Sequence, residues 1–97
     1  MDFLIKNARN TLDAMKQISK RLKEIDRDLK VNKDEDERLY GEQFKLVIDL
    51  SREFNHIDDL LKHLECDEQT MFIATRFRRQ ANELIGERES YDINGNN

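Results

Sequence analysis

The chain contains no proline, only three glycines and a single cysteine. Without proline, helices can run long without a break in their interior. The single cysteine, Cys66, cannot form an internal disulfide, and the start of the chain has no apolar run long enough for a signal peptide or a membrane span. We therefore expect a cytoplasmic protein that does not enter a membrane.

Apolar residues are also scarce, since the 97 residues are 37% hydrophobic and 39% charged. Such a chain has room for one domain with a small core, so we expect its stability to depend partly on self-association. Charged residues this frequent indicate disorder where they lack a pattern, but here they alternate with apolar stripes, as on solvated helix faces. No useful stretch alternates with the period of two that is typical of a strand. The sequence therefore predicts an all-α fold.

Two runs of apolar residues recur at alternating steps of three and four, which places each run on one side of a helix. Counting Met1 as heptad position a, the first run consists of Met1, Ala8, Met15, Leu22 and Leu29 at a, with Leu4, Thr11, Ile18 and Ile25 at d. The second consists of Tyr40, Val47, Phe54 and Leu61 at a, with Leu50, Ile57 and Leu64 at d. The runs predict helices over residues 2–31 and 35–65. Asn32 suits the end of the first, and Asp34 with Glu37 has the spacing of a capping box for the second.

The last third of the chain follows a different phase. Its best apolar stripe consists of Thr70, Ile73, Phe77 and Leu84. This stripe is two residues out of step with the second run, a shift that a continuous coiled coil does not absorb. A break near Cys66 and Asp67, with Asp67 as the N-cap, predicts a third helix over residues 68–88 and a flexible polar tail over 89–97.

Further apolar residues lie beside the stripes, which is typical of a bundle of three or more helices rather than of a two-stranded coiled coil. The predicted fold is an antiparallel three-helix bundle over residues 1–88, with a long, coiled-coil-like hairpin formed by its first two helices. A third helix over 68–88 is shorter than its neighbours and ends before it reaches the turn of that hairpin.

The tip of the hairpin is therefore expected to stay uncovered. The apolar residues at this tip are Ile25, Leu29, Leu39, Tyr40, Phe44 and Val47. An exposed apolar patch on a small protein usually marks an association surface. We expect these residues to form the interface of a homodimer or larger homo-oligomer, or to bind another protein.

Positive charge gathers on the first predicted helix, although the net charge of the chain is −4. Seven cations occupy heptad positions b or f, opposite the apolar stripe: Lys6, Arg9, Lys16, Lys20, Lys23, Arg27 and Lys30. Such a line can contact phosphates or the carboxylates of an acidic partner, but the solvated face of an ordinary amphipathic helix is the simpler interpretation. A second cluster, Arg76, Arg78 and Arg79, is expected to form salt bridges with the acidic second helix. Phe77, which lies between them, belongs to the core stripe and cannot stack on a base.

Residues that could perform chemistry are few. Asp59, His63 and Cys66 have spacings that could place them near one metal ion, but no other helix offers a cysteine or histidine to complete a tetrahedron, and His56 is two turns from His63. We therefore expect no metal site and no cofactor. The sequence also has no glycine-rich loop and no recognisable catalytic order of nucleophile, histidine and carboxylate, so we do not expect an enzyme.

These observations favour a small protein-interaction module that acts as an adaptor or inhibitor of a larger protein partner. The alternative is a nucleic-acid or nucleotide-binding module that uses the seven cations of the first helix. Short helical chains that contain lysine and asparagine are frequent in phage and mobile elements, and an origin of that kind is the expectation from size.

Overall fold

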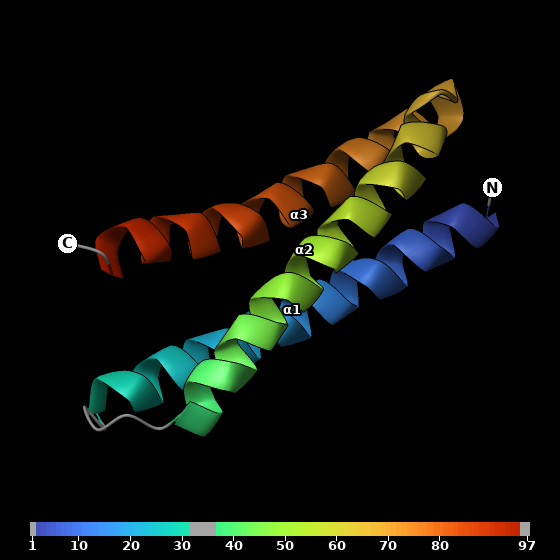
Figure 1. The fold of residues 1–97 in the computed structure, drawn as a ribbon. Helices are drawn as coiled ribbons and strands as arrows, with labels where there is room; N and C mark the ends of the chain where they lie inside the picture. The colour runs from blue at the N-terminus through green and yellow to red at the C-terminus, as the bar shows by residue number, and fades with distance from the viewer. Residues whose placement is uncertain (1, 32–36, 96–97) are drawn as a thin grey trace.

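The computed structural model describes the backbone of residues 2–95 except 32–36, and side chains from Phe3 to Val31 and from Glu37 to Gly86. It contains three helices, α1 (Asp2–Val31), α2 (Glu37–Glu65) and α3 (Glu68–Gly95). Successive helices run in opposite directions, and the molecule is elongated, with extents of 52 × 23 × 15 Å (Figure 1). The all-α three-helix bundle predicted from the heptad runs is confirmed. No helix in the described ranges is both long enough and apolar enough to span a bilayer.

The long hairpin of α1 and α2 has the predicted bounds to within two residues. α2 begins at Glu37, whose carboxylate suits the positive end of the helix dipole. Asp34 of the predicted capping box and Asn32, the predicted end of the first helix, lie outside the described residues. Helices of nearly equal length can pack side by side along the hairpin, and this packing buries or half-buries the described members of both heptad runs except Tyr40.

The turn between α2 and α3 lies where the shift in phase predicted it, at Cys66 and Asp67. Asp67 is the N-cap, since its Oδ1 accepts a hydrogen bond of 2.9 Å from the backbone N–H of Gln69. The buried Thr70 hydroxyl donates a hydrogen bond of 2.5 Å to the Leu64 carbonyl, which ties the first turn of α3 back to the end of α2. The same carbonyl accepts a hydrogen bond of 3.3 Å from the backbone N–H of Asp67, so two donors from the turn cap the end of α2.

The core is formed by the predicted stripes of all three helices. Its buried members in one cluster are Ala8, Leu12, Met15 and Leu22 from α1, Leu50, Ile57, Leu61 and Leu64 from α2, and Ala74, Phe77 and Ala81 from α3. Leu12 lies off the heptad seam and is nevertheless buried, because a bundle needs a wider stripe than a two-stranded coil. The two alanines let α3 approach its neighbours closely on either side of Phe77.

α3 is longer than predicted, and its C-terminal half diverges from the hairpin. It continues to Gly95, seven residues beyond the predicted end at Arg88, so the predicted tail is helical up to that glycine, and residues 96–97 lie outside the described residues. The segment after Arg88 is polar but contains no proline, and polarity alone does not end a helix. Figure 1 shows that the C-terminal end of α3 lies apart from the tip of the hairpin. The tip is therefore left uncovered because α3 diverges from the hairpin, and not because α3 is short.

Candidate interaction surfaces

Three large apolar side chains of α2 are exposed near the tip of the hairpin. Tyr40, Phe44 and Ile48 have exposed fractions of 51%, 70% and 37%. They are four residues apart and so lie on one face of the helix; we call them the tip stripe. Gly41 lies beside Phe44, and a Cβ added to it would meet no atom within 4 Å, so the backbone of α2 is open to close approach there.

The remaining residues predicted for this surface lie deeper. Ile25 is fully buried, which corrects the prediction that it lines an exposed patch. Its d position faces α2, so the hairpin itself covers it. Leu29, Leu39 and Val47 are half-buried. Ile48 was missed because it lies outside the heptad seam, although its spacing of four from Phe44 was visible in the sequence.

Polar contacts close the hairpin near its tip. Arg21 of α1 donates two hydrogen bonds to the Glu42 carboxylate of α2, at 2.7 and 2.9 Å. These bonds lower the pKa of Glu42 and raise that of Arg21. Nearby, the Gln43 amide donates a hydrogen bond of 2.6 Å to the buried Asp26 carboxylate. Both contacts join α1 to α2 in the part of the hairpin near its tip.

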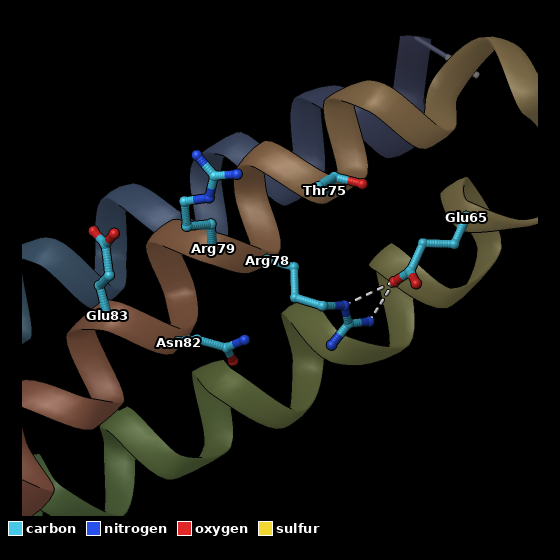
Figure 2. Close-up of a pocket in the computed structure, with 6 residues that line it drawn as sticks. All are labelled: Glu65, Thr75, Arg78, Arg79, Asn82 and Glu83. Carbon is cyan, nitrogen blue, oxygen red and sulfur yellow. Dashed lines mark hydrogen bonds and ion pairs between the residues drawn. The ribbon is translucent and has the colours of Figure 1, made fainter.

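A second polar cluster joins α2 to α3 at the other end of the molecule. Arg78 donates a hydrogen bond of 2.7 Å from Nη1 to Asp58 and another of 2.9 Å from Nε to Glu65, as Figure 2 shows for Glu65. Hydrogen bonds from Arg78, and then from Lys62, hold the pKa of the Asp58 carboxyl below its usual range. We call Arg78, Asp58 and Glu65 the arginine clamp. Salt bridging of this arginine to α2 was predicted and is confirmed.

The depression beside the clamp offers no evident chemistry. It is lined by Glu65, Thr75, Arg78, Arg79, Asn82 and Glu83. In Figure 2 the side chains of Arg79 and Glu83 point away from α2, and the one cation directed at α2 is already paired with Glu65. The depression is therefore better explained as the packing of the clamp than as a binding pocket.

The other two arginines of the cluster, Arg76 and Arg79, do not form salt bridges with α2 as Arg78 does. Arg76 lines a groove between α3 and α1 whose cationic members are Arg9, Lys16 and Arg76, beside a single anion, Asp13. Arg76 and Arg79 form no hydrogen bond or ion pair with the described residues. The prediction that all three arginines bridge to α2 is therefore wrong for these two. Successive helical residues are 100° apart, so Arg76 and Arg78 must lie on opposite sides of Phe77, and the sequence already contained that signal.

All seven cations predicted on the first helix are exposed on α1. Five of them, Lys6, Arg9, Lys16, Lys20 and Arg27, form no hydrogen bond or ion pair with the described part of the chain. Their charge is therefore not neutralised within the fold. The groove adds Arg76 to this basic side of the molecule.

The residues considered as metal ligands in the sequence do not form a metal site with other described side chains. His56, Asp59, His63 and Cys66 are exposed on α2 or its end, and the Cys66 thiol donates a hydrogen bond of 3.2 Å to the Lys62 carbonyl. Over the described ranges no three histidine, cysteine or acidic side chains gather as a metal site would require.

No family model, curated protein or solved structure matches this chain. Its function is therefore inferred from the chemistry of its own surfaces.

Proposed function

We propose that this protein is a small, non-enzymatic interaction module that self-associates through the tip stripe and acts as an adaptor or inhibitor of a larger protein. The observation that supports this proposal is the exposure of Tyr40, Phe44 and Ile48 along one face of α2. In a chain with so few apolar residues, three consecutive positions of one helical face are apolar and face water. Contiguous exposed apolar area of this kind is typical of an association surface.

The geometry of the stripe suits a symmetric pair of helices. If two copies pack with their α2 helices antiparallel about a two-fold axis at Phe44, Tyr40 of each copy faces Ile48 of the other, because both lie four residues from the axis. Gly41 and Ser51 border the stripe, and these small residues allow two helices to approach closely. No charged side chain lies between the three apolar residues on this face.

The test is the mass of the particle in solution at micromolar concentration, measured by light scattering. The unmodified chain is expected to be a dimer, and Phe44→Glu should shift it to monomer because a dimer would bury two like charges at its axis. The matched control is Phe3→Glu, since Phe3 is 72% exposed on α1, well away from the tip stripe. That variant should remain a dimer. A monomeric parent, or equal loss of dimer in both variants, would contradict the proposal.

A second candidate function is nucleic-acid or nucleotide binding by the basic face of α1. The observation that favours it is that five of the seven cations are exposed and have no partner among the described side chains. Binding should weaken steeply as salt rises, because phosphate contacts release counterions. Changing Lys16, Lys20 and Lys23 together to Glu should abolish binding and leave the circular dichroism of the helices unchanged. An unaltered affinity in this triple variant would remove the candidate.

A further inference from the structure

We propose that α3 completes a binding surface for single-stranded nucleic acid, in which Phe72 stacks on a base and Arg76 and Arg79 contact phosphates together with Arg9 and Lys16 of α1. This inference rests on the second candidate function and specifies its ligand and its second helix. The predicted site was a line of cations on one helix. The fold adds an aromatic residue and two arginines from a helix about 60 residues later in the sequence.

The aromatic residue is Phe72, whose side chain is 71% exposed in the second turn of α3. It lies five residues before the buried Phe77, which puts the two rings on different sides of the helix. Phe77 is part of the core and cannot stack on a ligand, as expected, whereas nothing in the fold covers most of Phe72. An exposed ring beside cations is the usual platform for an unpaired base.

The cations that flank Phe72 lie on its own face of α3. Arg76 follows it by four residues and Arg79 by seven, which is the spacing of neighbours on one helical stripe. Neither guanidinium is paired with a described residue, whereas Arg78, between them in sequence, is held by Asp58 and Glu65. The two free arginines therefore keep the donors whose fork geometry fits a phosphate.

The groove between α1 and α3 extends this surface. Arg9 and Lys16 line it opposite Arg76, so cations of two helices face one channel of about 490 Å³. A polyanion that follows the groove would meet these side chains in succession. Phe72 is not part of the lining, but it precedes the lining residue Arg76 by one helical turn on the exposed face of α3, within reach of a strand that leaves the groove. Asp13 is the one acidic residue of the lining, and three cations outweigh it.

A single strand fits these features better than the other polyanions. The apolar floor of the groove, Leu12 and Phe77, is already buried in the core, so an acidic amphipathic helix would find little apolar surface to cover inside the groove. A duplex keeps its bases stacked inside, where Phe72 cannot reach them. An unpaired base can leave its neighbours and stack on an exposed ring, and its backbone can follow the cations.

The experiment measures fluorescence anisotropy of a labelled thymidine strand of about 20 nucleotides, a length that exceeds the span of one small binding domain. A duplex of the same length and a poly-glutamate peptide serve as competing ligands at low salt. Phe72→Ala is expected to weaken binding of the strand by about tenfold and to leave duplex binding unchanged. Phe3→Ala removes a phenylalanine of equal exposure from α1 and should leave both affinities unchanged.

The arginines are tested through salt dependence. Arg76→Gln with Arg79→Gln should reduce the slope of log affinity against log salt by about 1.4, or about 0.7 for each lost phosphate contact on a single strand. The matched control is Lys45→Gln with Arg52→Gln, which removes two exposed cations from α2 and should leave the slope unchanged. All variants alter exposed side chains, and circular dichroism checks that their helices persist.

The outcomes separate this inference from the function on which it rests. If the Lys16, Lys20 and Lys23 variant loses binding while the α3 variants bind normally, α1 acts alone and the inference is wrong. If the parent binds neither strand nor duplex at low salt, both are wrong. If poly-glutamate binds as tightly as the strand, the surface recognises acidic peptides and the inference is likewise overturned.

Discussion

The two ends of the α1–α2 hairpin are built from the same heptad pattern but are stabilised differently. At the end that contains Ala8 and Leu61, α3 packs over the hairpin and Phe77 fills the space between the three helices. At the tip, α1 and α2 have only each other, and polar contacts such as Arg21 with Glu42 join them beside an exposed apolar stripe. The comparison shows that one sequence pattern can lead to a buried core at one end of a hairpin and to exposed apolar side chains at the other, depending on whether a third helix covers them.

The largest expected difference between the two ends comes from removing one phenylalanine from each. Phe77→Ala should lower the free energy of unfolding by about 3 to 5 kcal/mol, because it leaves a cavity in the three-helix core. Phe44→Ala should change it by less than about 0.5 kcal/mol when measured on the monomer, since its ring faces water. Urea denaturation at low protein concentration measures both. Equal losses would show that the tip is packed as tightly as the core.

A smaller difference is expected between the two arginine contacts. Arg78→Met should cost about 1 to 2 kcal/mol, because it leaves the partly buried Glu65 without its cation and Asp58 with Lys62 alone. Arg21→Met, at the more exposed tip, should cost less than Arg78→Met, because water screens the contact between Arg21 and Glu42. Both are read from urea denaturation at neutral pH, and a larger loss for the tip variant would reverse the comparison.

The clamp should also show itself in the pH dependence of stability. The pKa of Asp58 is lower in the folded chain than in the unfolded chain, so its contribution is complete above the unfolded value and is lost as pH falls through the folded value. The stability gap between the parent and Arg78→Met should therefore be constant near neutrality and narrow below about pH 4. If the stability difference between the parent and Arg78→Met stayed constant down to the folded pKa of Asp58, the contact of Arg78 with Asp58 would not contribute to stability.

The smallest effects concern two helical glycines. Gly41→Ala and Gly86→Ala should each stabilise the monomer by about 0.5 to 1 kcal/mol, because alanine favours the helix and its Cβ would meet nothing within 4 Å in either place. Only Gly41 borders the tip stripe. If two α2 helices approach closely there, Gly41→Ala should also weaken the dimer, whereas Gly86→Ala should not. Light scattering across a dilution series distinguishes the two glycines.

Much of the fold was predictable from periodicity, because the spacing of apolar residues reports directly which face of a helix is buried. This accounts for α1, for α2 and for the break at Cys66 and Asp67. The end of α3 was not predictable in this way, since residues after Arg88 carry no apolar stripe and their polarity was equally compatible with a helix and a tail. Ile25 was wrongly predicted to be exposed for another reason. Its heptad position indicates that it contacts another helix, but not which one.

The residues of the candidate sites also fall into those that the sequence predicted and those that it did not. The exposed cations of α1 were found from the sequence alone, because exposure opposite a seam follows from helical geometry. The exposure of Tyr40 and Phe44 was also predicted, but from a short third helix, whereas in the structure α3 is long and diverges from the tip. The sequence did not predict that Arg76 and Arg78 face different helices, because this depends on which helix lies on each side of Phe77. The exposure of Phe72 likewise depends on the packing of α3.

The order of apolar and polar residues by itself determined that this chain forms three helices. It also determined which stripe each helix buries and, to within two residues, where each of the first two begins and ends. These properties depend on neighbours within a few residues. Only the tertiary structure decided that α3 diverges from the hairpin tip, that Arg78 faces α2 while Arg76 faces α1, and that Phe72 stays exposed. The direction and tilt of a packed helix depend on all its side-chain contacts together, among residues far apart in the sequence, and no local pattern contains that sum.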